Sequence, residues 1–170
     1  NTEPLIYGDF MNVTPSEYRP NVGIMLINAD NQVFVGQRLD RFSDAWQMPQ
    51  GGIDQGEDPQ TAAYRELLEE TGITQELVQI LDFTTDWIHY DFPEDLAAKL
   101  WKGRYRGQKQ RYYLMRFLGR DDQINIKTKK PEFSDWRWSN VNTLEDKIVE
   151  FKRQVYRQVI SEFSVYLRKP

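Results

Sequence analysis

Short apolar runs, separated by turn residues, recur along most of the chain. Residues 22–28 read VGIMLIN, a turn rich in Asn and Asp follows, and residues 32–37 resume the apolar pattern. Runs of this length, rich in branched side chains, predict paired β-strands. Similar runs at residues 79–87, 112–117 and 136–139 predict further strands.

Two other segments indicate helices. Residues 59–71 lie between Asp58, a favourable N-cap, and Gly72, a favourable residue just past a helix end. A second, C-terminal helix is predicted from the spacing of Ile148, Phe151, Val155, Val159, Phe163 and Tyr166. Helices and strands mixed in this way indicate an α/β domain with a mixed sheet between helices. The sequence has no repeat or linker, so we expect one domain at residues 18–170, preceded by an N-terminal arm or extension at residues 1–17.

The composition narrows the classes of function. The 170 residues include no cysteine, which excludes disulfides, thiolate metal sites and cysteine nucleophiles. No apolar run is long enough to span a bilayer, and the N-terminus lacks the basic-then-apolar form of a signal peptide. We therefore expect a cytoplasmic protein that does not bind membranes. Nothing in the sequence indicates a protein partner.

The charge is unevenly distributed along the chain. The net charge is −4, yet residues 96–120 contain no Asp or Glu. The basic residues of this stretch are Lys99, Lys102, Arg104, Arg106, Lys109, Arg111, Arg116 and Arg120. Aromatic residues are interleaved with them, as in many surfaces that bind nucleic acid. The stretch favours a polyanionic substrate, with an ordinary solvated basic loop as the alternative.

The predicted helix at residues 59–71 carries three carboxylates on one face. Glu66 lies three residues before Glu69 and four before Glu70, so the three side chains are neighbours. Their mutual repulsion is hard to explain by stability, whereas Mg²⁺ prefers a few carboxylates combined with water and phosphate oxygens. An exposed acidic helix is the alternative. Arg65 lies outside the acidic face and can reach back to Glu57 in the preceding loop.

The surrounding residues complete a recognisable pattern. It reads G-x5-E-x7-R-E-U-x-E-E-x-G-U, where U is a bulky aliphatic residue, and its fixed positions are Gly51, Glu57, Arg65, Glu66, Glu69, Glu70 and Gly72. This pattern resembles the signature of the Nudix hydrolases, and it favours a metal–phosphate site over the acidic-helix alternative. The resemblance implies an α/β/α sandwich around a mixed sheet, which agrees with the hydrophobic pattern.

Motifs outside this box extend the resemblance over residues 18–167. They read YRPNVG from residue 18, WQMPQGG from residue 46, RGQKQ from residue 106, PEFSDWRW from residue 131 and FKR from residue 151. Together they resemble the branch that holds bacterial RNA pyrophosphohydrolases and the plant-type asymmetric diadenosine tetraphosphate hydrolases.

The resemblance also implies roles for individual residues. It assigns divalent metal, Mg²⁺ with Mn²⁺ or another divalent cation as a substitute, to Glu66, Glu69 and Glu70. Glu132 would assist the metals or the attacking water, with an unimportant loop carboxylate as the alternative. A carboxylate from a separate loop is a chemically sensible proton acceptor, because glutamates that already hold metal are poor ones.

Substrate-binding roles are implied for a second set of residues. Positions that match phosphate contacts are Arg19, Arg38 and Lys109, and positions that match the nucleotide pocket are Phe151 and Lys152. Phe151 also fits the core face of the last helix. Tyr90 is a candidate for base stacking, with packing as the alternative. The single histidine, His89, is expected to be an ordinary polar residue rather than a catalyst.

The sequence thus predicts metal-assisted hydrolysis of a nucleotide phosphoanhydride. The favoured substrate is the 5′-triphosphate end of RNA, converted to a 5′-monophosphate with release of pyrophosphate. The alternative is a dinucleoside polyphosphate hydrolase that splits diadenosine tetraphosphate into ATP and AMP. A binding module with an inactive Nudix site is a third hypothesis, which the complete set of box glutamates disfavours.

Overall fold

The computed structural model describes residues 17–168, so the expected N-terminal arm lies, except for Glu17, outside the described residues. Eight strands form one sheet with the central order β3-β2-β1-β7-β5, while β4 pairs with β1, β6 with β7 and β8 with β2. The strands are β1 (Tyr18–Ile27), β2 (Val33–Arg38), β3 (Trp46–Gln47), β4 (Gln50–Gly52), β5 (Val78–Phe83), β6 (Ile88–Asp91), β7 (Gly107–Phe117) and β8 (Phe133–Ser139). The α-helices are α2 (Pro59–Thr71), α3 (Glu94–Lys99), α4 (Leu144–Lys147), α5 (Arg153–Glu162) and α6 (Ser164–Leu167).

The sheet is mixed, as the sequence predicts. Its centre is the parallel pair β1 and β7, which stay in register from Tyr18 opposite Gly107 to Ile27 opposite Arg116. The other strand pairs are antiparallel. The parallel pair is largely buried, as is usual where helices cover both faces of a sheet.

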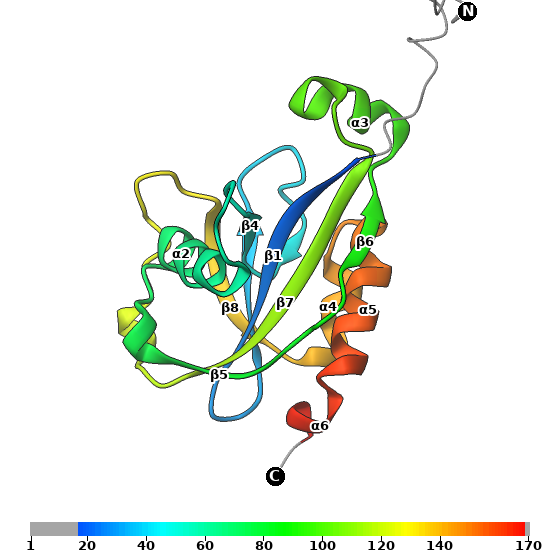
Figure 1. The fold of residues 1–170 in the computed structure, drawn as a ribbon. Coiled ribbons are helices and arrows are strands. Elements are labelled where there is room, and N and C mark those ends of the chain that lie inside the picture. Colours follow the sequence, from blue (N-terminus) through cyan, green and yellow to red (C-terminus); the bar gives the residue numbers. More distant parts are fainter. Residues whose placement is uncertain (1–16, 169–170) are drawn as a thin grey trace, which may run out of the picture.

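Helices cover both faces of this sheet (Figure 1), with α2 on one side and α4 and α5 on the other. Successive residues of a strand point to opposite faces. Accordingly, Val22 of β1 packs with Leu67 of α2, whereas Met25 packs with Val155 and Tyr156 of α5. The predicted α/β sandwich is therefore confirmed, and each face of β1 contributes to a separate part of the core.

Helix α2 has the predicted ends. The side chain of Asp58 accepts a hydrogen bond from the Thr61 amide at 3.2 Å, and Pro59 occupies the first turn. Gly72 has a left-handed φ of 71°, and its amide donates to the Leu68 carbonyl. These caps fix where α2 starts relative to the glycine loop of β4, which positions the acidic face.

Several predicted boundaries differ from those in the structure. The strand predicted at residues 79–87 ends at Phe83, and a separate strand, β6, follows. The strand predicted from residue 112 begins five residues earlier, at Gly107, because its polar first half pairs with β1 and β6 through the backbone. The strand predicted from residue 136 begins at Phe133.

The single continuous helix predicted near the C-terminus is wrong, although α5 forms the middle of it. The segment from Ile148 folds instead as extended backbone at Ile148 and Val149, the 3-10 helix η5 (Glu150–Lys152), α5 and α6, and α4 comes before it. Ile148 and Phe163 are nevertheless buried in the core. Each short helix packs its apolar residues against the same face of the sheet. The apolar residues are therefore spaced as in one helix, although the helix is interrupted.

Candidate active site

A cleft of about 960 Å³ lies where β4, the acidic face of α2 and the loop before β8 meet. Six of the residues predicted to bind metal or substrate line it, namely Arg19, Arg38, Glu66, Glu69, Glu70 and Glu132, and the box residue Gly51 does so as well. The predicted substrate-binding residues that do not line it are Lys109, Tyr90, Phe151 and Lys152. The cleft has the size of a nucleotide pocket, and its walls carry both acidic and basic groups.

The glutamates of α2 differ in their surroundings. Glu70 is buried and accepts a hydrogen bond from the Gln50 amide at 3.2 Å. Burial, together with the charges of Glu66 and Glu132, raises its pKa well above the usual value. Burial also raises the pKa of Glu66 to about 7, against the opposing effect of Arg65. Carboxyls this close to one another in a poorly hydrated place are destabilised when ionised and are stabilised by a nearby cation.

The exposed Glu132 joins these acids from the loop before β8. Partial loss of water raises the pKa of its carboxyl, while the nearby Arg38 lowers it. Gly51 makes room for the acidic cluster, because a Cβ at this position would overlap the carboxyl of Glu66. The carboxylate oxygens of this cluster, next to a glycine that leaves space for an ion, are suitable ligands for a divalent cation.

The acids do not, however, form a finished coordination shell. Within residues 17–168, no three His, Cys, Asp or Glu side chains are grouped closely enough to hold a metal ion as they stand. Arg65 instead pairs with Glu66 at 2.8 Å and with Glu69 at 3.4 Å. The assignment of metal to Glu66, Glu69, Glu70 and Glu132 stays a prediction.

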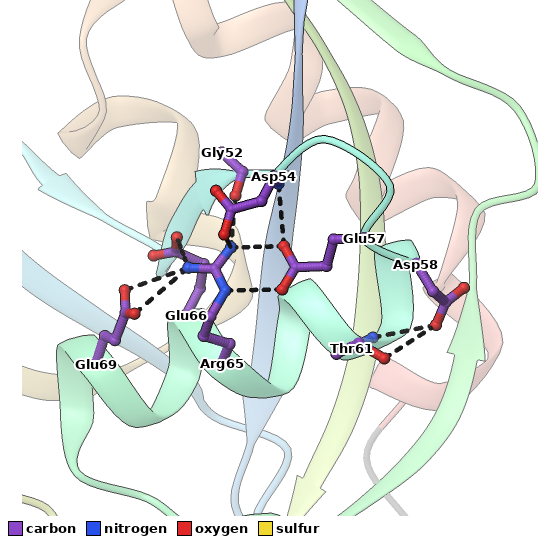
Figure 2. Close-up of polar contacts among 8 residues, drawn as sticks. All are labelled: Gly52, Asp54, Glu57, Asp58, Thr61, Arg65, Glu66 and Glu69. Atoms are coloured by element: carbon purple, nitrogen blue, oxygen red, sulfur yellow. Dashed lines mark hydrogen bonds and ion pairs between the residues drawn. The ribbon is translucent and has the colours of Figure 1, made fainter.

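Arg65 joins the glycine loop to α2 (Figure 2). Its Nε and Nη2 atoms each donate to one carboxylate oxygen of Glu57, both at 2.8 Å, in a bidentate pair. Nη2 also donates to the Gly52 carbonyl at 2.8 Å. Hydrogen bonding to Arg65 lowers the pKa of Glu57 to about 2. The predicted contact between Arg65 and Glu57 is confirmed, and its effect is to hold the loop at residues 53–58 against the helix.

Arg19 enters the same corner from β1. A Cβ on Gly52 would overlap its guanidinium, so the guanidinium lies directly over this glycine. The indole of Trp101 lies on the guanidinium as well, with 4.6 Å between the Arg19 Cζ atom and the ring centroid. Within residues 17–168, the Arg19 side chain makes no hydrogen bond or ion pair. Its donors are therefore available for a phosphate.

Arg38 lies at the rim of the cleft but is already paired. Its guanidinium bonds to Asp40 through both Nε and Nη2 and lies over the ring of Phe42. The Arg38 guanidinium helps to lower the pKa of Asp40, although burial opposes this shift. A phosphate that binds Arg38 must compete with Asp40.

Behind the cleft, buried polar side chains support Gln50. The Gln50 Oε1 atom accepts hydrogen bonds from Gln110 Nε2 at 3.0 Å and from Lys152 Nζ at 3.1 Å. Gln110 also donates to Asn21 at 2.7 Å. Burial and the nearby Arg38 lower the pKa of Lys152 to about 7. Lys152 therefore lies one residue behind the cleft wall, in contact with Gln50.

The remaining predicted residues lie elsewhere. Tyr90 and Phe151 pack against each other in the core, as the packing alternatives predict, with 6.0 Å between their ring centroids. Lys109 lies over the indole of Trp87 at 4.7 Å. Residues alternate between faces along β7, so Lys109 points to the face opposite Gln108, which lines the cleft. His89 is exposed and packs edge-on against Tyr18.

Other cleft residues escaped the sequence reasoning. The cleft is also lined by Asn21, Gln50, Trp101, Gln108, Lys129 and Lys130. Trp101 belongs to the basic, aromatic stretch at residues 96–120, which was the only signal that could have found it. Lys129 and Lys130 adjoin the PEFSDWRW motif, but adjacent lysines are common on solvated loops.

Comparisons with family models and with named proteins indicate the same family for this chain. Residues 17–159 match the NUDIX domain family. The chain is 55% identical over 160 residues to a protein of Roseobacter denitrificans named RNA pyrophosphohydrolase, covering 91% of this chain and 100% of that one. A protein of the same name from Zymomonas mobilis is 52% identical, with 89% and 97% of the two chains covered.

Solved structures share the fold at lower identity. The Escherichia coli dihydroneopterin triphosphate pyrophosphohydrolase has a TM-score of 0.68 and 20% identity, with 85% of this chain and 98% of that chain covered. A Caenorhabditis elegans Ap4A hydrolase complex has a TM-score of 0.62 and 20% identity, with 86% and 98% covered. The chain belongs to the Nudix family. Hydrolases of this family generally act with divalent metal ions. Across residues 17–168, none of the helices has the length and apolar character needed to cross a membrane.

Proposed function

We propose that this protein is an RNA pyrophosphohydrolase that converts 5′-triphosphate RNA ends to 5′-monophosphate ends and releases pyrophosphate. The name carried by relatives that are 52% to 55% identical over most of the chain supports this substrate. The observation that carries the proposal in the structure is the meeting of Glu66, Glu70 and Arg19 in one cleft. The cleft offers carboxylates for a cation and, for a phosphate, a guanidinium that has no hydrogen-bond or ion-pair partner among residues 17–168.

We propose Mg²⁺ as the resident cation, with Mn²⁺ as a substitute, held by Glu66, Glu69 and Glu70 with the help of Glu132. When bound, such a cation polarises phosphate oxygens and lowers the pKa of a water molecule. To admit it, Glu66 and Glu69 must loosen their contacts with Arg65. Arg65 can release them without losing its place, because its bidentate pair with Glu57 and its bond to Gly52 do not involve these two acids.

The chain's own residues would then orient the substrate. Arg19 donates to phosphate oxygens at the floor of the cleft, and Lys129 and Lys130 add positive charge at its rim. Where Glu132 is not bound to the cation, it would be the carboxylate that takes a proton from the attacking water, because it comes from a separate loop and its raised pKa favours proton acceptance. The proposed substrate also places the protein in the cytoplasm, and no protein partner is needed for the reaction.

The experiment compares two substrates in one assay. Purified protein with Mg²⁺ is given triphosphorylated RNA and diadenosine tetraphosphate, and kcat/KM is measured for each together with the products. We expect pyrophosphate and 5′-monophosphate RNA as the main products, and loss of turnover in excess chelator. A clear preference for diadenosine tetraphosphate would favour the alternative hydrolase. Turnover that survives the chelator would contradict the metal-dependent site.

A further inference from the structure

The guanidinium of Arg19 contacts two parts of the chain, Gly52 and Trp101. The backbone of Gly52 lies on one side, where a Cβ would overlap the guanidinium. The indole of Trp101 also lies against it, at 4.6 Å. Both Gly52 and Trp101 line the cleft. A guanidinium stacked on an aromatic ring retains its in-plane N–H donors, because the ring contacts its face.

Trp101 comes from a segment with an unusual backbone. Trp101, Lys102 and Gly103 have φ values of 44°, 59° and 74°, so three consecutive residues adopt the left-handed conformation. L-residues other than glycine rarely visit this region, and then mostly one at a time. Such a conformation persists where surrounding contacts hold it, and it is often found at ligand sites.

Aromatic neighbours hold the segment in place. Phe92 stacks on Trp101 with ring centroids 5.8 Å apart and an interplanar angle of 27°. Tyr105 meets the same indole edge-on at 6.0 Å. Phe92 is itself buried in the core beside Phe151. The contacts thus run from the core through Phe92 to Trp101 and then to Arg19.

The indole nevertheless remains 41% exposed. Its burial is too incomplete for packing alone to explain both the exposed aromatic surface and the left-handed backbone. What the arrangement does achieve is to fix in one orientation an arginine that has no hydrogen-bond or ion-pair partner in the described part of the chain. Fixing a long side chain in advance lowers the entropy that is lost when it binds a ligand.

We propose that Trp101 is a positioning residue that, with Gly52, clamps Arg19 in the orientation that binds the substrate's phosphates. This inference rests on the proposed function for the identity of the substrate. It extends the site to the short 3-10 segment η2 (Leu100–Gly103), which follows α3 and lies some 80 residues from Arg19 in the sequence. The clamp recognises a polyphosphate group and is independent of the base.

The test compares Trp101→Leu with Trp101→Phe. The first variant removes the aromatic face, and the second keeps a smaller one. We expect Trp101→Leu to raise KM for triphosphorylated RNA by about tenfold, with kcat changed less than about threefold, and Trp101→Phe to recover most of the loss. The matched control is Trp46→Leu, which removes a similar Trp–Arg pair, with Arg137 at 4.0 Å, outside the cleft. The control should leave KM unchanged.

A double-variant cycle separates positioning from direct contact. If Trp101 acts through Arg19, Trp101→Leu causes no further loss in an Arg19→Gln background. Equal losses in both backgrounds, or an unchanged KM for Trp101→Leu, would overturn the proposal. Calorimetry with inorganic pyrophosphate distinguishes this proposal from the proposed function. Weaker pyrophosphate binding by Trp101→Leu supports the clamp even if the wild-type protein fails to hydrolyse RNA, and equal binding by both proteins contradicts it.

Discussion

Two arginines contact Gly52, and they are used in opposite ways. Arg65 donates to the Gly52 carbonyl and to both oxygens of Glu57, and it also pairs with Glu66 and Glu69. Arg19 lies over the same glycine, yet its donors have no partner within residues 17–168.

The difference shows how to tell a structural cation from a binding one near an acidic cluster. A guanidinium whose donors are all used stabilises the backbone around it. A guanidinium held by contacts that are not hydrogen bonds, as Arg19 is against Gly52 and Trp101, keeps its donors for a ligand. Each of the following substitutions changes one residue in the group around Gly52, which we call the Gly52 corner.

The largest effect is expected from Glu69→Gln. Glu69 is the more exposed of the two α2 acids paired with Arg65, with 57% of its side chain accessible and contacts of 3.4 Å, against 12% for Glu66. Its replacement should lower kcat by about a thousandfold through loss of the proposed metal ligand. The urea midpoint should stay unchanged, because Arg65 keeps its bonds to Glu57. Glu162→Gln on the exposed face of α5 is the matched control. Full turnover in Glu69→Gln would refute the assignment of this acid.

The next largest effect is expected from Arg65→Met. This change leaves Glu57 without its bidentate partner and frees the loop at residues 53–58. We expect a loss of about 3 kcal/mol in the free energy of unfolding, measured by urea denaturation. Activity should fall with it, because Gly52, which adjoins this loop, also loses its hydrogen bond from Arg65. A variant as stable as the wild type would show that this network is not structural.

Two glycine substitutions separate the contribution of Arg19 from that of Glu66. A Cβ on Gly52 meets the end of the flexible Arg19 side chain, whereas a Cβ on Gly51 meets the carboxyl of Glu66. Gly52→Ala should therefore fold normally and raise KM by about tenfold, as Arg19 leaves its place. Gly51→Ala should lower kcat more than it changes KM. The same kinetic profile in both variants would contradict this division of roles.

The smallest effect is a pH dependence of stability. Pairing with Arg65 lowers the pKa of Glu57 from 4.5 to about 2 in the folded protein. A carboxyl with a depressed folded pKa stabilises the fold above its unfolded pKa, and this stabilisation is lost as pH falls from about 4.5 to about 2. We expect the Glu57 contribution to be about 1 kcal/mol, given its place near the surface. In Glu57→Gln, the decline of stability over this range should be smaller by that amount. An unchanged decline would contradict the pairing.

The sequence predicts the Arg65 side of the corner well, and the Arg19 side poorly. Arg65 and Glu57 are only eight residues apart. The caps at Asp58 and Gly72 fix the ends of the helix that carries Arg65, so the local sequence determines the contact between Arg65 and Glu57. Arg19 was found only through resemblance. Its contact with Trp101 depends on the left-handed turn at residues 101–103, which no local sequence rule predicts.

The same contrast explains the other differences. Lys109 was expected at a phosphate, but the side to which it points depends on the register of β7 against β1. The first half of β7 is polar and therefore lacks the apolar signal of a strand: Gln108 lines the cleft, Gln110 supports Gln50, and Lys109 lies over Trp87 on the other face. Features that depend on pairing between distant segments were the ones that the sequence pattern missed.

One measurement tests most directly the claim that Arg65 builds the corner while Arg19 binds the substrate. It records kcat/KM for triphosphorylated RNA and the urea midpoint for Arg19→Gln beside Arg65→Met. We predict that Arg19→Gln loses about a hundredfold in kcat/KM at an unchanged midpoint, because charged hydrogen bonds to phosphate are lost while no side-chain hydrogen bond within residues 17–168 is broken. Retained kcat/KM, or a fall in the midpoint as large as that of Arg65→Met, would contradict the account.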